Sequence, residues 1–461
     1  MEQPKVYDTE EELIKWLICD LEEQKKEIAK GKNIDIKEVK YKELVLNFGN
    51  NKIKINENEK LLQGGNLTKY RNYLIRFNFI LEEVLKYFNI KEQHIEKEKN
   101  GFPYLICPFK VNISHCIFEA TIIHFNAIIF EETVSFINTT FCNEVNFFAL
   151  KFIKSVYFDR VNFDCGKDIS FYNILFKSKV DFSNLKWKNK LLFYDINSNL
   201  EFNLSTLNII DTLEIIEFNK NKEDNSDSII NLDNISFENS KSLLSIKANT
   251  IESASLKYIY MDGRINFYNI KIKNINLKGT SIIGNFSDIN CEYDNLSNWQ
   301  TARILKHEEY KKSNSIKALE YHAEEIKLYK EYLSKDIKKK FNIGKLGDIF
   351  SIYLSSFYSN NGLNWIKSLV MTILITIIFF SIFYIPSIFN LNYIFNKDYL
   401  YKLVEYFIPT KYDSLIEYAK NSNVYTLKKI CGIIVYFAGK IMFWYGSVQT
   451  VQSFRKFSKK E

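Results

Sequence analysis

The sequence lacks the cysteine pattern of a disulfide framework or of a zinc knuckle. Its seven cysteines are an odd number, and none of them stands in a CxxC pair. Both features argue against a structural zinc site and against paired disulfides, and they favour a reducing compartment. The first residues, MEQPKVYDTEEELIKW, contain no basic segment followed by an apolar one, so no signal peptide is expected.

Sequence signatures of catalysis are missing as well. The glycines of GNNK, QGGN and GTSIIG do not have the spacing of a phosphate-binding loop, and no GxSxG motif occurs. Acidic residues in the middle of the chain are scattered rather than paired. We therefore expect that the protein is not an enzyme and that it binds no cofactor.

Two histidines could contribute to a metal site, but their spacing is not that of a metal motif. His307 and His322 have the carboxylates of Glu308, Glu309, Glu324 and Glu325 nearby, yet no HExxH or HxH sequence is present. Imidazole and carboxylate are metal ligands. The sequence favours a solvated charged surface over a metal site here, and no metal is expected.

Phenylalanine, in contrast, is abundant and regularly spaced. Between residues 125 and 163 the intervals alternate between five and six, which matches neither a helix nor a plain strand. The recurring residues are Phe125, Phe130, Phe136, Phe141, Phe147, Phe152, Phe158 and Phe163.

The residue two positions before each phenylalanine is aliphatic or β-branched: Ile128, Val134, Thr139, Val145, Leu150, Val156 and Val161. In a short strand such a pair points to the same side. Two inward residues followed by a turn would wind the chain into a solenoid with four faces and 22 residues per coil, so that each phenylalanine lies over the one in the previous coil. An ordinary β-sandwich with alternating aromatic residues is the alternative.

This pattern resembles the pentapeptide-repeat family over residues 111–292, where the spacing resumes after a short insertion at Phe171, Phe176, Phe182 and Trp187. The resemblance implies a right-handed quadrilateral parallel β-helix. The chain departs from the family motif in the larger residue two positions before each phenylalanine and in the six-residue intervals, which would fit a distorted or a wider coil.

Residues 1–110 predict a small mixed α/β unit. Thr9 and Glu12 form a potential capping box for a helix that runs through about Ala29 and is terminated by Gly31. The segment ELVLNFGNNKIKIN (43–56) alternates around a turn at Gly49 and predicts a β-hairpin. NYLIRFNFILEEVLKYF (72–88) predicts an amphipathic helix.

Residues 293–345 change to a helical period and predict a helical hairpin with a turn at Ser313 to Ser315, followed by a basic linker. Such a hairpin could cap the open end of the solenoid. The order of repeats, a TARILK-like helix, a hairpin and a membrane tail resembles a group of bacterial pentapeptide-repeat membrane proteins.

Residues 346–461 predict a membrane domain with two transmembrane helices at about 366–389 and 430–453. The first candidate has no charge from Ser368 to Phe389, which is long enough to cross about 30 Å of hydrocarbon. The second is weaker because Lys440 lies within it. Basic residues precede the first span and follow the second, so both termini are expected in the cytoplasm of a bacterium, at the inner membrane.

Three residues of the second span are candidate membrane or pore residues. Lys440 could line a pore, contact an anionic lipid, or extend along the helix to the membrane surface. Gln449 and Gln452 share a helix face and could form hydrogen bonds between subunits, or they could mark the end of the span.

Two functions fit these features. The first is a membrane-anchored scaffold that presents the solenoid to an unidentified protein partner and lies on an anionic leaflet. The alternative is an oligomeric two-span pore with the β-helix as sensor or assembly domain, which would require a homo-oligomer. Nucleic acid is not expected as a partner, because residues 111–290 contain 18 Lys or Arg and 21 Asp or Glu, too near balance to imitate DNA.

Overall fold

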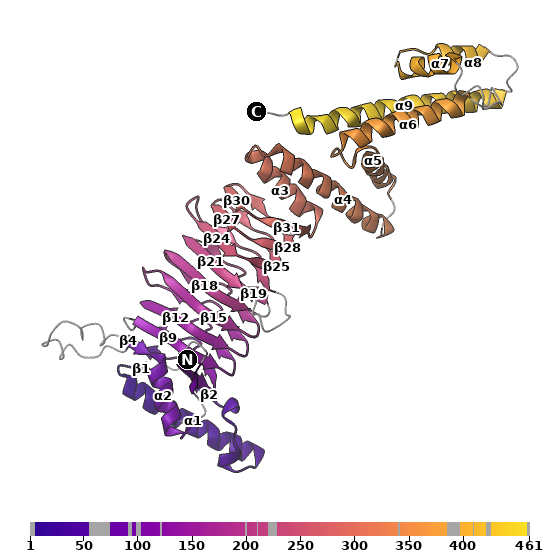
Figure 1. Ribbon diagram of the computed structural model, residues 1–461. Helices are drawn as coiled ribbons and strands as arrows, with labels where there is room; N and C mark the ends of the chain where they lie inside the picture. The colour runs from indigo at the N-terminus through magenta and orange to yellow at the C-terminus, as the bar shows by residue number, and fades with distance from the viewer. Residues whose placement is uncertain are drawn as a thin grey trace. The chain divides into compact units, whose positions relative to one another are not determined.

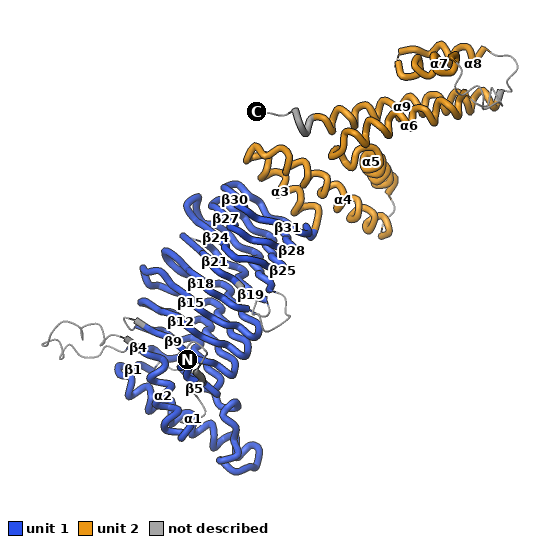
Figure 2. The backbone as a smooth tube through the Cα atoms, in the orientation of Figure 1, with its two compact units in different colours: residues 1–297 blue, residues 298–461 orange. Residues whose placement is uncertain are grey.

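The protein divides into two compact units, residues 1–297 and residues 298–461 (Figure 2). The computed structural model describes residues 5–54, 74–90, 95–97, 103–119, 122–198, 201–209, 211–219, 228–339, 342–384, 397–408, 410–420 and 426–458. The predicted fold class is confirmed: a parallel β-solenoid with an N-terminal helix and strand segment precedes a helical C-terminal part with two apolar helices.

The solenoid makes about eight turns, in which each coil pairs in parallel with the next (Figure 1). Its largest sheet contains one strand of every coil, and these are the longest strands in the first five coils: β9 (Ile122–Phe130), β12 (Glu144–Phe152), β15 (Ile169–Phe176), β18 (Lys190–Ser198), β21 (Thr212–Asn219), β24 (Leu243–Ala248), β27 (Arg264–Tyr268) and β30 (Asn285–Ile289). At its N-terminal end this sheet also includes β4 (Leu74–Arg76), β5 (Ile95–Lys97) and β6 (Pro103–Cys107).

A second sheet contains one strand per coil, short at first and longer from β25 onward: β2 (Val45–Asn47), β7 (Lys110–Asn112), β10 (Val134–Ser135), β13 (Val156–Tyr157), β16 (Val180–Asp181), β19 (Glu201–Asn203), β22 (Ile229–Asn231), β25 (Thr250–Ser255), β28 (Lys271–Asn276) and β31 (Glu292–Leu296). The remaining face is formed by β1 (Val6–Tyr7), β3 (Lys52–Ile53), β8 (Ile117–Phe118), β11 (Thr140–Phe141), β14 (Asn162–Phe163) and β17 (Lys186–Trp187), and then by β20 (Asn208–Ile209), β23 (Ser236–Phe237), β26 (Tyr260–Met261) and β29 (Ser281–Ile282).

The long strands are bent by one residue in the left-handed region, which divides each of them into two faces. In successive coils this residue is Ala127, Ala149, Asn173, Asp195 and Glu217, with φ between 50° and 56°. A non-glycine residue adopts this conformation at a cost, so packing must stabilise the bend. The result is a coil with four faces, and Phe147 pairs with Phe125, 22 residues earlier.

Aromatic side chains fill the interior as stacked ladders. Phe125 stacks on Phe147 with ring centroids 5.1 Å apart, and Phe147 stacks on Phe171 at 4.4 Å. Three further ladders join Phe130 to Phe152, Phe136 to Phe158 and Phe141 to Phe163. All eight recurring phenylalanines are buried, so these rings provide most of the apolar contact between consecutive coils.

The N-terminal segment covers the first coil of the solenoid. It contains α1 (Glu10–Lys32), the short 3-10 helices η1 (Ile36–Glu38) and η2 (Tyr41–Glu43), and α2 (Phe77–Tyr87). The ring of Phe77 lies 4.8 Å from that of Phe125 and 5.4 Å from that of Phe48. Helix α2 therefore shields the end of the aromatic ladder from water, as the end of a repeat stack requires.

Two local predictions in this segment are wrong. Helix α1 continues past Gly31 to Lys32, and the left-handed residue after it is Asn33, whose N–H binds the carbonyls of Ala29 and Lys30. The segment 43–56 forms no hairpin, because β2 and β3 pair in parallel with different sheets of the solenoid. The turn at Gly49 is a corner of the coil.

The second unit is helical. It contains α3 (Trp299–Lys311), α4 (Ser315–Lys339), α5 (Ile343–Ser359), α6 (Trp365–Tyr384), α7 (Lys397–Phe407), α8 (Asp413–Lys420) and α9 (Thr426–Ser458). Helices α3 and α4 form the predicted hairpin, with Ser313 in a left-handed conformation between them. Residues 385–396, which include the end of the first predicted span, lie outside the described residues.

Helices α6 and α9 pack along each other in opposite directions. The ring of Trp365, at the start of α6, lies 4.5 Å from that of Phe454 near the end of α9, and Phe383 lies 5.0 Å from Tyr436. Gly439 and Gly446, seven residues apart, permit the close approach, because a Cβ at these positions would overlap Phe379 and Thr372. Small residues at such a seam are typical of helix pairs in membranes.

Candidate functional site: two surfaces and a buried lysine

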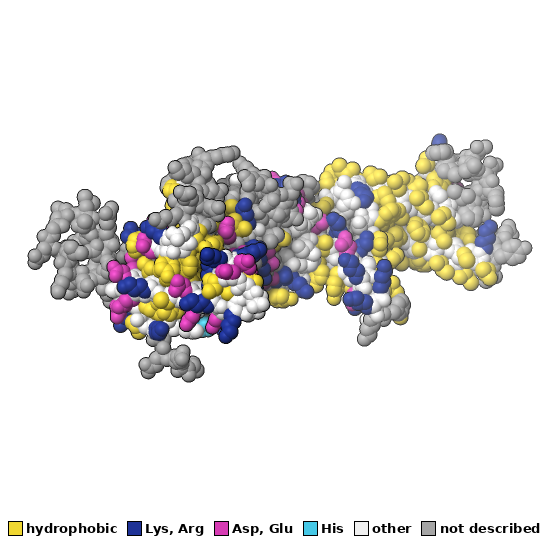
Figure 3. Space-filling model, turned by 90° about the horizontal axis from the view of Figure 1, so that it is seen from below, with side chains coloured by type: hydrophobic (Ala, Val, Ile, Leu, Met, Phe, Trp, Pro, Cys, Tyr) yellow, Lys and Arg dark blue, Asp and Glu magenta, His cyan; other side chains and the backbone are white. Residues whose placement is uncertain are grey.

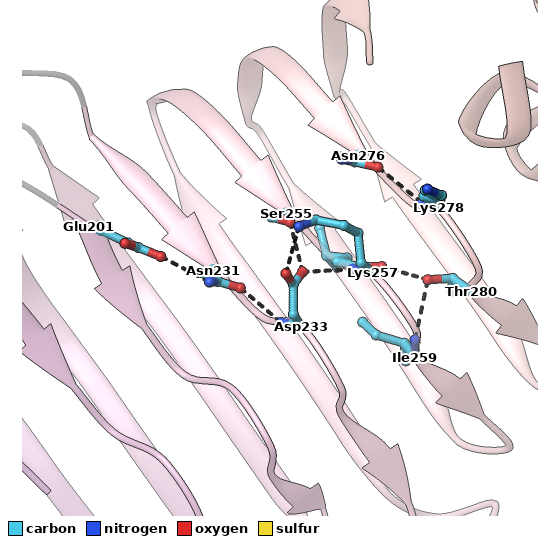
Figure 4. Close-up of polar contacts among 10 residues, drawn as sticks. Glu201, Asn231, Asp233, Ser255, Lys257, Ile259, Asn276, Lys278 and Thr280 are labelled. Carbon is cyan, nitrogen blue, oxygen red and sulfur yellow. Dashed lines mark hydrogen bonds and ion pairs between the residues drawn. The ribbon is translucent and has the colours of Figure 1, made fainter. Parts of the chain in front are cut away.

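Polar side chains form a ladder along one corner of the solenoid (Figure 4). The Asn231 amide donates to Glu201 at 2.9 Å, and Asp233 accepts from the Ser255 hydroxyl at 2.7 Å and from the backbone N–H of Lys257 at 2.9 Å. The Lys257 ammonium lies 2.9 Å from the same carboxylate. These groups bind one another, so the ladder stabilises the corner.

An aromatic ladder on the outside of the solenoid is different, because its rings face solvent. Phe148 stacks on Tyr172 at 5.4 Å, and Tyr172 stacks on Tyr194 at 4.9 Å. Phe148 and Tyr172 are 37% and 41% exposed. The strand register continues the ladder to Ile216 in the next coil. We call these four residues the outer ladder.

Two carboxylates lie beside the outer ladder, at the bends of β18 and β21. Asp195 and Glu217 follow Tyr194 and Ile216 directly in the chain. Burial and the charge of Glu217 raise the pKa of Asp195 above its ordinary value. The Tyr194 hydroxyl forms a hydrogen bond with Glu217. The raised pKa of Asp195 reflects its partial burial and the negative charge of Glu217 beside it, and a basic group placed there would favour the ionised form of Asp195.

Lys440 lies in α9 and is only 4% exposed. Its ammonium donates to the carbonyl oxygens of Tyr406 at 2.6 Å, Ile408 at 2.8 Å and Lys411 at 3.4 Å. Carbonyls at the end of a helix such as α7 have no partner within the helix, and the helix dipole favours a cation there.

Three tyrosine rings surround the Lys440 ammonium: those of Tyr406, Tyr412 and Tyr436, with centroids 4.8 Å, 5.6 Å and 5.7 Å from it. Cation–π attraction adds to the three hydrogen bonds. Lys440 therefore fastens the segment after α7 to α9, and its ammonium is directed into the unit.

Gln449 and Gln452 lie near the other end of α9. The side-chain oxygen of Gln449 lies 2.8 Å from the Ser359 hydroxyl and 3.3 Å from that of Ser355, so it connects α9 to the end of α5 within one chain. Gln452 lines a cavity of about 390 Å³ together with Gln449, His322 and Asn361. The cavity lining is polar and uncharged on this side, which suits a hydrogen-bonding group better than a metal ion.

Three of the four hairpin acids, Glu308, Glu309 and Glu325, are buried in ion pairs, whereas Glu324 lies on the solvated surface that the sequence predicts. Glu325 binds the guanidinium of Arg303 at 2.7 Å and the ammonium of Lys306 at 2.5 Å. Burial opposes its ionisation, but the His322 imidazole 3.6 Å away and the hydrogen bonds from Lys306 and Arg303 lower the pKa of Glu325 to about 2.

Metal ligands do not gather in the part of the chain that the structure describes: no three His, Cys, Asp or Glu side chains there could hold an ion together.

Sequence reasoning missed the exposed apolar faces of α5 and α7. Helix α5 exposes Ile343 and Phe350, and α7 exposes Tyr401 and Val404. In the space-filling view, hydrophobic side chains gather over the C-terminal helices, whereas charged side chains of both signs mix on the N-terminal unit (Figure 3). Helices α6 and α9 are long and apolar enough to cross a membrane. The three-to-four-residue spacing at 343–357 could have revealed α5.

Comparisons with known proteins give no match: no family model, no curated protein and no solved structure resembles the chain significantly.

Proposed function

We propose that the protein is a membrane-anchored scaffold whose solenoid binds a protein partner through the outer ladder. The observation that carries the proposal is the exposed stack of Phe148, Tyr172 and Tyr194 on a rigid coil, attached through the same chain to two helices of membrane-spanning length. Aromatic side chains held by a rigid scaffold lose little conformational freedom on binding, which is why they dominate interfaces.

The partner chemistry follows from the charges beside the ladder. A segment with apolar side chains could cover the rings, and a lysine or arginine next to it could approach Asp195 and Glu217. Such a contact would bury apolar area and also relieve the crowding of two carboxylates.

The resemblance of the repeat spacing supports membership of the pentapeptide-repeat family and a location at the inner membrane of a bacterium. In this arrangement α6 and α9 cross the bilayer, and both the solenoid and the C-terminus lie in the cytoplasm. The basic residues that precede α6 and follow α9 support this orientation under the positive-inside rule, and an anionic leaflet would attract them. Nucleic acid is not proposed as a partner.

The alternative of an oligomeric pore draws less support from the geometry. Lys440 and Gln449, which motivated it, bind groups of their own chain. A scaffold needs neither residue to face another subunit.

Affinity capture from native membranes tests the scaffold. The full chain, solubilised in detergent, is compared with the double variant Tyr172→Ser and Tyr194→Ser, and with Tyr260→Ser as a matched control, because Tyr260 is 54% exposed in another sheet. We expect a protein that is retained by the wild type and by the control and is lost at least tenfold from the double variant. Equal retention by all three chains would refute the outer ladder as the binding surface.

A further inference from the structure

We propose that α5 is an interfacial helix that lies in the headgroup region of the bilayer and inserts one apolar stripe into the hydrocarbon boundary. This inference rests on the proposed membrane anchor and adds a lipid-binding surface to it. The stripe consists of Ile343, Leu346, Phe350, Tyr353 and Phe357, which follow one another at alternating intervals of three and four residues.

These five side chains lie on one side of the helix and are exposed, with Ile343 at 77% and Phe350 at 64%. Residues three and four apart share a helix face, so the stripe is continuous over the 17 residues of α5, about 25 Å. Asp348 lies on the opposite side and is exposed as well. A narrow apolar face opposite a polar one is the pattern of a helix that lies in a membrane surface.

The other side of α5 is held by the two apolar helices. The Tyr358 hydroxyl donates to the carbonyl of Met442 at 3.2 Å, and Ser359 binds Gln449. Both partners belong to α9. Only the short segment 360–364 separates α5 from α6. If α6 and α9 cross the bilayer, α5 must therefore lie at the level where they enter it, with its stripe turned away from them.

The residues beside the stripe distinguish lipid from a second copy of the chain. A coiled coil of two α5 helices would have charged residues on either side of the apolar seam. The flanking positions here are Gly347, Ser351 and Leu354 on one side and Ile349 and Ser356 on the other. Aromatic residues such as Phe350, Tyr353 and Phe357 are typical of the membrane interface.

Basic residues at the end of α4 add attraction to an anionic leaflet. Lys335, Lys338 and Lys339 are exposed in the last turns before α5. The Lys345 ammonium is paired with Asp336, which ties the start of α5 to α4. Lysines close to a membrane surface are attracted to anionic lipid, so these three side chains would favour the same placement of α5.

Depth-dependent quenching in proteoliposomes tests the proposal. In the full chain, serine replaces the four cysteines that are not buried: Cys19, Cys142, Cys291 and Cys431. Three variants of this chain each carry one new cysteine, through Phe350→Cys, Asp348→Cys or Val370→Cys. The new cysteine is labelled with an environment-sensitive fluorophore. The liposomes contain phosphatidylglycerol and carry a nitroxide either near the headgroup or deep in the acyl chain.

We expect the label at 350 to be quenched at least threefold more by the shallow nitroxide than the label at 348, which iodide in the water should quench instead. Equal quenching of these two labels by iodide would overturn the proposal. A cross-link between residue 350 of one chain and residue 350 of another would also overturn it, if the shallow nitroxide does not quench the label at 350. The label at 370, on an exposed face of α6, reports separately on the anchor. If the deep nitroxide does not quench the label at 370, the proposed membrane anchor is wrong. If the label at 370 is quenched but the shallow nitroxide does not quench the label at 350, only the placement of α5 is wrong.

Discussion

At the scale of single residues, Lys440 has the sharpest energetic consequence. Its ammonium is buried and satisfies three backbone carbonyls after α7. Backbone polar groups at membrane depth are tolerated only where the protein satisfies them. A methionine at this position would keep the apolar length of the side chain but remove its hydrogen bond to the Tyr406 carbonyl. The Ile408 oxygen would keep the backbone N–H of Lys411, and the Lys411 oxygen would keep the Tyr436 hydroxyl.

We expect Lys440→Met to destabilise the packing of α7 and α8 on α9 by about 2 kcal/mol, because the Tyr406 carbonyl would lose its donor and an unsatisfied buried acceptor costs about 1–3 kcal/mol. The measurement is thermal unfolding in detergent, together with proteolysis in the segment 397–420. Lys397→Met is the matched control, since Lys397 is exposed at the start of α7. An unchanged melting temperature and digestion pattern for Lys440→Met would contradict the fastening role.

At the scale of the element, each coil of the solenoid depends on the one before it through the aromatic ladders. Phe158 lies between Phe136 at 4.4 Å and Phe182 at 4.6 Å, and its ring also meets Phe147 and Phe171 edge to face. Its removal would open a cavity that the flanking coils cannot close without losing their own stacking.

We expect Phe158→Ala to lower the free energy of unfolding of the solenoid by about 4 kcal/mol, within the range for a buried phenylalanine. The neighbouring Tyr157→Ala should cost much less, because Tyr157, the last residue of β13, is only half-buried whereas Phe158 is fully buried. Urea unfolding followed by circular dichroism measures both changes. Similar losses for the two variants would show that stacking in the ladder does not determine the stability of the coil.

The solenoid was accessible to sequence reasoning because its period is imposed by the backbone. Each inward pair, such as Val145 and Phe147, repeats whenever the chain returns to the same face, so the spacing survives in the sequence. The corner at Gly49 was not predictable in the same way, since Gly-Asn-Asn suits both a hairpin turn and a coil corner. Only the partner strands β7 and β8, which follow β2 and β3 by 65 residues, distinguish the two.

The candidate surfaces were less accessible for a related reason. Phe148 and Tyr172 point outward in a chain that is rich in aromatic residues. The local sequence does not distinguish them from the inward phenylalanines, and only the strand register does so. The burial of Lys440 depends on α7, whose packing brings Tyr406 beside α9. The apolar spacing within each helix can be read from the sequence. The sequence does not show which other helix provides the carbonyl oxygens that bind the Lys440 ammonium.

At the scale of the whole molecule, the antiparallel pairing of α6 and α9 fixes a topology for any membrane arrangement. Trp365 lies beside Phe454 at one end, and Phe383 lies beside Tyr436 at the other. If both helices span, the chain before α6 and the chain after α9 must emerge on the same side. Helices α7 and α8 connect α6 to α9, so they belong to the opposite side or the opposite leaflet.

We therefore expect opposite accessibility for Cys19, which is exposed in α1, and for a cysteine introduced by Ala419→Cys at the end of α8. In inside-out vesicles, with Cys142, Cys291 and Cys431 replaced by serine, a membrane-impermeant maleimide should label Cys19 at once. It should label position 419 at least tenfold more slowly until detergent is added. Equal labelling of both cysteines in sealed vesicles would place α1 and α8 on one side, which two spanning helices in this pairing cannot produce. Right-side-out vesicles provide the control, because there the order of labelling must reverse.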